Sequence, residues 1–166
     1  ICVCNCAGYS TAAVSDLVFG MLISFYRRLS ACDSAVRAGK TKDGLIGFEL
    51  AGKKFGVIGT GAIGTRVLSI AQAFGCETYA YSRTKKDLAG VTYTDLDTLL
   101  SACDIVSLHV PLTEETRGMV HAGNISLMKK NAVLINTARG PVVDSAALTA
   151  ALQNQQIAGA CIDVFD

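Results

Sequence analysis

The chain has 166 residues, of which 51% are hydrophobic and 17% charged, and its formal net charge is +1. This length fits a single domain with a complete hydrophobic core. The near-neutral charge argues against nucleic acid and against strongly cationic partners, because it provides neither a basic nor an acidic field. The first residue is Ile1, and no basic segment precedes an apolar stretch. We therefore expect no signal peptide, and we expect the natural chain to begin further upstream.

The first thirty residues predict a hinge strand, a turn and a long helix. Ile1–Cys4 reads as a strand and Ala7–Ser10 as a turn, after which Ser10 or Thr11 can cap a helix that runs to about Ser30. One apolar stripe on this helix consists of Val14, Leu17, Val18, Met21, Leu22, Phe25 and Leu29. Further apolar residues extend well around the cylinder, which predicts burial on two sides. A core helix and a homodimer or interdomain interface would leave the same pattern.

The longest apolar segment, Ala12–Tyr26, is too short and contains too many polar residues to span a membrane. We therefore expect a soluble, cytoplasmic protein without a membrane partner. The seven cysteines are Cys2, Cys4, Cys6, Cys32, Cys76, Cys103 and Cys161. No second ligand group at zinc-like spacing follows the Cys-x-Cys-x-Cys run, so we predict no metal site. Free thiols packed in the core or at an interface, in a reducing compartment, are the simpler interpretation.

From Lys53 onward, predicted strands and helices alternate. We expect strands at residues 55–58, 77–81, 105–108, 132–135 and 157–164, and helices at residues 62–74, 95–101 and 144–152. Gly75 is expected to end the first of these helices as a C-cap. Apolar strands that alternate with helices are typical of a parallel sheet covered on both faces. The sequence thus predicts a doubly wound, Rossmann-like α/β fold in which residues 1–166 form one domain.

The loop after the first of these strands has the pattern Gly-x-Gly-x-x-Gly and opens a predicted helix, the context in which this motif binds a dinucleotide. Gly59 permits the tight turn, Gly61 lets a pyrophosphate approach the backbone, and Gly64 lets helix and strand pack closely. The N–H groups of Ala62 and Ile63 at the helix N-terminus would face the phosphates. We therefore predict a nucleotide coenzyme.

The end of the second strand bears on which dinucleotide binds. An NAD site usually places a carboxylate there to hold the ribose 2′-hydroxyl, whereas this chain has residues 82–86, SRTKK. A 2′-phosphate would find the guanidinium of Arg83 and the hydroxyls of Ser82 and Thr84. A solvated surface loop beside a permissive NAD site would have the same composition. We favour NADP(H), with NAD(H) possible.

Three further strand ends are expected at the same crevice, because ligands of open α/β sheets bind at the carboxyl ends of the strands. They are His109–Thr113 with Thr116 just beyond, Asn136–Gly140, and Cys161–Val164. Arg139 suits the capture of a carboxylate and the polarisation of an adjacent carbonyl, although a surface salt bridge would also explain it. His109, beside a proline at a strand end, is expected to form a pocket wall rather than to act as an acid or base.

These motifs together resemble the nucleotide-binding domain of the D-isomer-specific 2-hydroxyacid dehydrogenases. The resemblance extends over essentially the whole chain. It comprises NCAGYS (residues 5–10), the glycine loop, SLHVPLTEETRG (107–118), Met128-Lys129, INTARGPVVD (135–144) and AGACIDVF (158–165). INTARGPVVD is the most specific of these segments.

The resemblance implies an oxidoreductase that transfers a hydride between NAD(P)H and a 2-oxo or D-2-hydroxy acid. Arg139 matches the catalytic arginine, and Ala62 and Ile63 match pyrophosphate contacts. The remaining matches are Ser82 and Arg83 at the ribose, His109, Val110 and Pro111 at the adenosine wall, Thr137 and Ala138 beside the nicotinamide, and Asp163 near its carboxamide. Ser82 replaces the usual aspartate, which weakens an assignment to NAD.

In this family a glutamate and then a histidine acid/base follow the Asp-Val-Phe segment, and the chain ends at Asp166, before both positions. The substrate domain is also missing. We therefore expect the chain to be a fragment that binds coenzyme without turnover. Two alternatives stay open: a dinucleotide-sensing dimerisation module like the corepressors of the family, and a formate or phosphite dehydrogenase.

Overall fold

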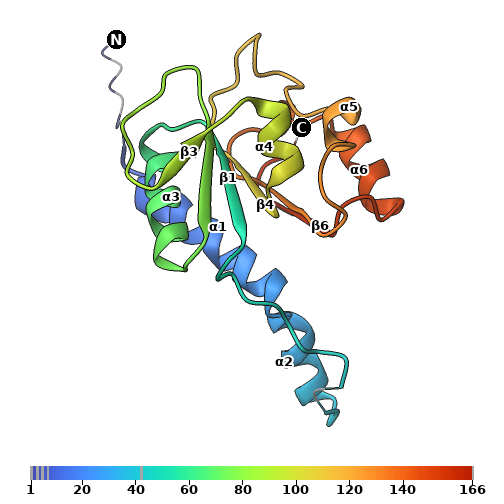
Figure 1. Cartoon of the computed structure of the whole chain (residues 1–166). Coiled ribbons are helices and arrows are strands. Elements are labelled where there is room, and N and C mark those ends of the chain that lie inside the picture. The colour runs from blue at the N-terminus through green and yellow to red at the C-terminus, as the bar shows by residue number, and fades with distance from the viewer. Residues whose placement is uncertain (1, 3, 5, 7, 42, 166) are drawn as a thin grey trace.

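A computed structural model describes the whole chain except Ile1, Val3, Asn5, Ala7, Lys42 and Asp166. Six parallel strands form one sheet in the order β3-β2-β1-β4-β5-β6 (Figure 1). The strands are β1 Lys54–Ile58, β2 Glu77–Tyr81, β3 Val91–Tyr93, β4 Ile105–Leu108, β5 Val133–Asn136 and β6 Gly159–Ile162. The order reverses beside β1, which confirms the predicted doubly wound fold and places a crevice at the carboxyl ends of β1 and β4.

Helices cover both faces of the sheet. They are α1 Thr11–Tyr26, α2 Leu29–Arg37, α3 Ala62–Ala73, α4 Leu96–Ala102, α5 Ala122–Ile125 and α6 Ser145–Gln153, with a short 3-10 helix η1 at Gly140–Val142. Helices α1 and α3 pack together on one face, and α4, α5 and α6 cover the other. Along β1, Phe55 and Val57 face the first layer and Ile58 the second, so the strand is apolar on both sides.

The first helix ends earlier than the sequence suggests. A continuous helix to about Ser30 is wrong, because α1 stops at Tyr26 and Arg28 adopts a left-handed conformation with φ of 53°. The carbonyl of Tyr26, which a longer helix would use internally, accepts the N–H of Phe48 at 2.8 Å. A contact with a residue twenty-two positions further along the chain therefore ends the helix.

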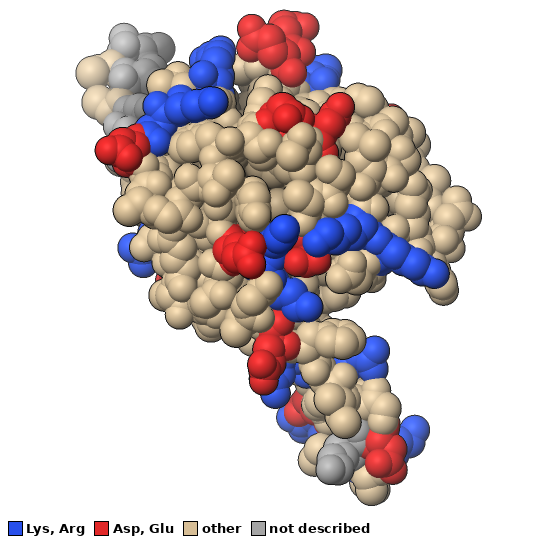
Figure 2. Space-filling view, in the orientation of Figure 1, with Lys and Arg blue, Asp and Glu red and all other residues tan. Residues whose placement is uncertain are grey.

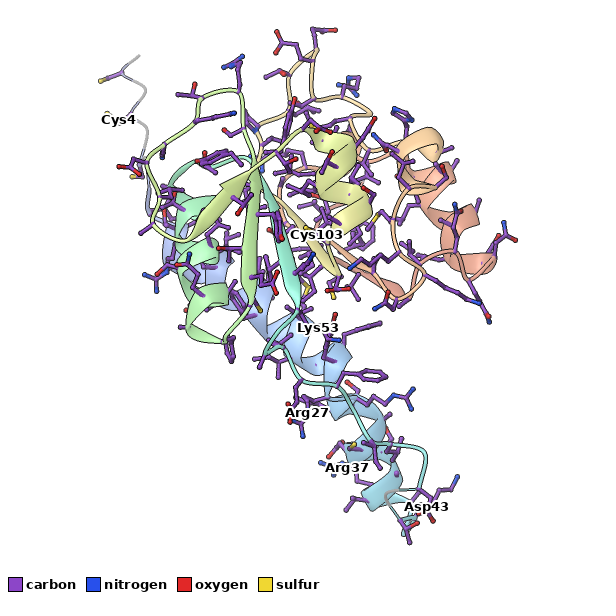
Figure 3. The ribbon with its side chains drawn as sticks, in the orientation of Figure 1. Cys4, Arg27, Arg37, Asp43, Lys53 and Cys103 are labelled. Carbon is purple, nitrogen blue, oxygen red and sulfur yellow. The ribbon has the colours of Figure 1, made fainter. Side chains whose placement is uncertain are left out.

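Beyond the break, α2 and residues 44–49 form an arm that projects away from the sheet (Figure 1). Arg27 and Lys53 lie where the chain leaves and rejoins the body, and Arg37 and Asp43 lie toward the tip (Figure 3). None of the residues of α2 is buried. The arm thus contributes surface rather than core.

Several smaller elements differ from the sequence-based expectation. Strand β3, helix α5 and η1 were not anticipated, and β6 is shorter than the expected strand. Cys2 and Cys4 do not lie in a strand, and the rest of the predicted strand Ile1–Cys4 is outside the described residues.

The seven cysteines differ in exposure, and Cys32 is half-buried. The prediction of core packing is wrong for the three N-terminal thiols, since Cys2, Cys4 and Cys6 are exposed, and their place at an interface stays a prediction. The buried thiols are Cys76, Cys103 and Cys161. Within the described ranges, no helix is long and apolar enough to cross a membrane.

Candidate functional site

The glycine loop links β1 to α3 and lies against the end of β4. Gly59 has φ of +98°, and a Cβ on it would stand 2.5 Å from the carbonyl oxygen of His109. A Cβ on Gly64 would stand 2.0 Å from the carbonyl oxygen of Gly59. Both approaches are closer than real Cβ contacts allow, so the fold itself requires glycine at these two positions.

Gly61 is different. Its φ is −68°, which any residue adopts, and a Cβ on it would meet no atom within 4 Å. Packing therefore gives no reason for glycine here, and the open space lies at the N-terminus of α3, whose first turn carries no acidic side chain. The N–H groups of Ala62 and Ile63 lack intrahelical acceptors by helix geometry, so this space suits an anion.

A cavity of about 630 Å³ adjoins the loop, a size typical of small-molecule sites. Its lining brings together the ends of β1, β2 and β4: Gly59, Thr60, Gly61, Tyr81, Ser82, Arg83, Thr84, Lys86, His109, Val110, Pro111, Thr113, Glu115, Thr116 and Met119. The structure thus gathers the residues expected around an adenosine ribose. The Thr116 hydroxyl donates to the Pro111 carbonyl at 2.7 Å and accepts from the N–H of Thr113 at 2.8 Å, which closes the turn beyond β4.

Arg83 has a partner that the sequence did not reveal. Its Nη1 lies 3.8 Å from Oε2 of Glu115 across the cavity mouth, and both side chains are largely exposed. Basic side chains gather over the β2–β3 loop, and acidic ones stand beside them over the β4–α5 connection (Figure 2). An exposed pair of this kind contributes about 0–1 kcal/mol, so Arg83 stays available to a ligand.

His109 forms a wall of the cavity, as the sequence predicts. Its Nε2 lies 2.8 Å from the hydroxyl of the fully buried Ser107. Burial lowers the pKa of His109 to about 4. The ring is therefore neutral at physiological pH and suits a wall better than a proton donor.

The depressed pKa of His109 predicts a pH-dependent loss of stability. Between pH 6.5 and 4 the unfolded chain takes up a proton that the folded chain does not, so stability falls as pH falls through this window. We expect the free energy of unfolding to drop by about 3 kcal/mol more in wild type than in His109→Gln. Denaturant titrations of both proteins at pH 7 and pH 4 measure this difference in the free energy of unfolding. Equal losses in the two proteins would show that His109 titrates normally.

The tip of β5 is held by Asn136. Its Oδ1 accepts the N–H of Ala138 and its Nδ2 donates to the carbonyl of Arg139, both at 3.0 Å. The Arg139 side chain is exposed and, among the residues that the structure describes, donates to the carbonyl of Ala138 alone, at 2.6 Å. Within the described residues no carboxylate pairs with it.

Two more predicted residues lie along the same edge of the sheet. Thr137 is buried, and its hydroxyl has no hydrogen-bond partner in the described part of the chain. The N–H of Asp163 donates to the carbonyl of Asn136 at 3.1 Å, which places an exposed carboxylate beside the tip of β5. Thr137, Arg139 and Asp163 do not line the cavity itself but follow it along the edge past β4. An orphaned buried hydroxyl costs about 1–3 kcal/mol, which a bound polar ligand would recover.

Comparison with known proteins agrees with this geometry. Residues 19–166 match the family model described as "D-isomer specific 2-hydroxyacid dehydrogenase, NAD binding domain". The chain belongs to this family. The glycine loop, the cavity and the exposed arginine therefore lie in an NAD-binding domain of the 2-hydroxyacid dehydrogenases.

Three relatives illustrate the range of the family. The glyoxylate reductase of Thermococcus litoralis is 43% identical over all of this chain and 54% of its own length. The D-lactate dehydrogenase of Aquifex aeolicus, solved with NAD and lactic acid, has a TM-score of 0.92 and 40% identity, covering 96% of this chain and 49% of that one. An acyclic imino acid reductase solved with NADPH and D-Arg has a TM-score of 0.92 and 35% identity, covering 97% and 53%. The chain spans about half the length of the curated relatives it matches.

Sequence reasoning missed some of the residues around the cavity. Thr60 lies inside the glycine motif and could have been named from its position. Glu115 lies within the motif SLHVPLTEETRG but was given no role, and Met119 reaches the cavity from just beyond that motif.

Proposed function

We propose that this chain is the coenzyme-binding half of a reductase that transfers a hydride from NAD(P)H to a 2-oxo acid, giving a D-2-hydroxy acid. The observation that carries the proposal is the open space at Gly61, because the fold does not need glycine there and a bound pyrophosphate does. The unpartnered hydroxyl of Thr137 fits the nicotinamide end of the same ligand. The glyoxylate reductase and D-lactate dehydrogenase names of the relatives support the substrate class.

We propose NADP(H) as the favoured coenzyme, with NAD(H) as the alternative. Ser82, Arg83 and Thr84 line the cavity where an adenosine ribose would lie, and no carboxylate occupies the end of β2. Glu115 favours NAD(H) instead, since its negative charge would repel the 2′-phosphate of NADP(H). Solved relatives carry NAD in three cases and NADPH in one, so both coenzymes occur among proteins similar to this chain.

Titration of the chain with NADPH and with NADH tests this preference. We expect NADPH to bind more tightly, and Arg83→Gln to weaken NADPH about tenfold while changing NADH less than about twofold. The matched variant Glu115→Gln should tighten NADPH about threefold, because the competing carboxylate is gone. Tighter binding of NADH by the wild-type chain would contradict the preference.

At the reacting end, Arg139 is proposed as the catalytic residue. When bound, the coenzyme supplies the hydride. The exposed guanidinium of Arg139 would bind the substrate carboxylate with two hydrogen bonds and draw electron density from the adjacent carbonyl. Asn136 holds the backbone of this loop on both sides, so the guanidinium starts from a fixed position.

The proton donor is proposed to lie outside these 166 residues. His109 is neutral in the cavity wall and so is a poor proton donor. The other histidine, His121, uses its Nδ1 to accept the N–H of Gly123 at the start of α5. We therefore propose that the substrate domain and the acid/base come from other parts of a longer protein, and that residues 1–166 bind coenzyme without turnover.

We propose that the longer protein is a homodimer, assembled through the arm and the outer side of α1. Large apolar side chains are exposed there, including Leu17, Phe25, Leu29, Val36, Ile46 and Phe48. Val36 and Ile46 are more than 70% exposed, and Leu17, Phe25 and Phe48 line one hollow between α1 and the arm. Exposed apolar surface of this kind is typical of an interface. The alternative is that α1 contacts the substrate domain of the longer protein.

Sedimentation at micromolar concentration tests the dimer. We expect a dimer for the wild-type chain and a shift toward monomer when Val36 and Ile46 are both replaced by serine, because each change removes apolar surface from the arm. The change should leave the melting temperature of a monomer unaffected, since α2 buries none of its residues. A wild-type chain that sediments only as a monomer would contradict the proposal.

The cytoplasm is proposed as the compartment. The thiols of Cys76, Cys103 and Cys161 are free and buried in the core, which suits a reducing environment.

A further inference from the structure

The loop between β2 and β3, residues 82–90, carries the side chains proposed to choose the coenzyme, and a chain of hydrogen bonds ties it to the glycine loop. The N–H of Lys86 donates to the Tyr93 hydroxyl at 3.1 Å. Tyr93 donates to the hydroxyl of Thr60 at 3.3 Å, and Thr60 donates to the carbonyl of Thr84 at 3.5 Å. All three bonds point the same way along the chain of groups, so each hydroxyl both accepts and donates. Successive hydrogen bonds arranged in this way strengthen one another.

Both side chains in the middle of this chain are fixed by other parts of the fold. Thr60 is 2% exposed and stands between the first two glycines of the motif. Tyr93 is the last residue of β3, where it pairs with Ala80 of β2, and its ring packs against the core on the α1 and α3 face. The two hydroxyls are therefore held by the sheet and by the glycine loop, and the β2–β3 loop is the part that they position.

The two ends of the β2–β3 loop are held independently. Ser82 follows directly on β2, and at the far end Thr78 donates to the carbonyl of Gly90 at 2.9 Å and Gln72 to that of Ala89 at 2.8 Å. In the part of the chain that the structure describes, the bonds to Tyr93 and Thr60 are the ones that tie the backbone of residues 84–86 to the body. The segment beside Arg83 thus depends on them.

We propose that Tyr93 is a positioning residue for the coenzyme, whose hydroxyl holds residues 84–86 against the glycine loop and so sets the place of the groups that meet the ribose 2′-substituent. The inference rests on the proposed function. A pyrophosphate on the glycine loop and a 2′-phosphate on the β2–β3 loop would belong to one ligand, and Tyr93 fixes the relative position of the two loops. Removing its hydroxyl should weaken a 2′-phosphorylated coenzyme more than an unphosphorylated one.

Tyr93→Phe, with Tyr79→Phe as the matched control, tests this in the 166-residue chain. Tyr79 lies on the neighbouring strand, and in the described part of the chain its hydroxyl bonds to Glu77 alone, at 3.5 Å. We expect Tyr93→Phe to weaken NADPH about tenfold and NADH about threefold, and to speed hydrogen exchange at the Lys86 amide about tenfold, since one to two hydrogen bonds are lost. The control should match wild type in all three, and the melting temperatures should agree within about 2 °C.

The possible outcomes separate the positioning role of Tyr93 from the proposed function. Wild-type affinity and wild-type exchange at Lys86 in Tyr93→Phe would overturn the positioning role. A general loss of affinity with a large fall in melting temperature would overturn it too, because that result indicates a structural role alone. Failure of the wild-type chain to bind either coenzyme would instead overturn the proposed function, while the exchange at Lys86 would still report whether the tie exists.

Discussion

Replacing Arg139 by glutamine is expected to lower kcat/KM for 2-oxo acid reduction by about a thousandfold in the longer protein. The guanidinium is exposed at the tip of β5 and donates to the neighbouring carbonyl of Ala138. Loss of a charge-assisted, two-point contact to the substrate carboxylate and carbonyl corresponds to about 4 kcal/mol of transition-state stabilisation. Steady-state kinetics with glyoxylate, hydroxypyruvate and pyruvate measures it.

The same substitution in the 166-residue chain serves as the control. Because the Arg139 side chain bonds only to its neighbour Ala138 within the described ranges, NADPH affinity and the melting temperature should stay close to wild type. A variant that keeps more than a tenth of the wild-type kcat/KM would remove Arg139 from the catalytic machinery. A variant that loses coenzyme affinity would assign it to the coenzyme instead.

Gly61→Ala is expected to weaken coenzyme binding at least about a hundredfold while leaving the fold intact. The added methyl group would enter the space in front of the α3 N-terminus, where no protein atom lies within 4 Å. With φ at −68° the backbone accepts alanine, so the free energy of unfolding should change by less than about 1 kcal/mol. Coenzyme titration and denaturant unfolding of the same sample give both values.

Gly64→Ala is the matched change with the opposite expectation. Its methyl group would meet the carbonyl oxygen of Gly59 at 2.0 Å, so we expect a loss of about 3 kcal/mol or more in the free energy of unfolding. If Gly61→Ala bound coenzyme as wild type does, the space at Gly61 would not be the pyrophosphate site. If Gly64→Ala were as stable as wild type, the close packing of α3 on β1 would not constrain the loop.

Much of the fold could be predicted because the responsible interactions are local or strongly patterned. The predicted strand at residues 132–135 is a continuous apolar run and the one at 105–108 is interrupted by Ser107 alone, and both belong to strands buried on both faces, while the helices between them carry one apolar face. The glycine spacing located the β1–α3 loop to the residue, because Gly59 and Gly64 are fixed by backbone approaches that no other residue allows.

What could not be predicted depends on contacts between distant segments. Helix α1 ends at Tyr26, whose carbonyl accepts the N–H of Phe48. The pairing of Arg83 with Glu115 joins two loops thirty-two residues apart, and nothing near either residue indicates it. Strand β3 has three residues, too few to show a period, yet it places Tyr93 beside the glycine loop.

The central claim is that residues 1–166 bind a nicotinamide dinucleotide along the carboxyl edge of the sheet. Amide chemical shifts recorded during titration with NADPH and with NADH test it most directly. We expect saturable changes at Gly61–Gly64, at Ser82–Thr84 and at Thr137–Arg139, with the arm unaffected. No changes at millimolar coenzyme, or changes confined to α1 and the arm, would contradict the account.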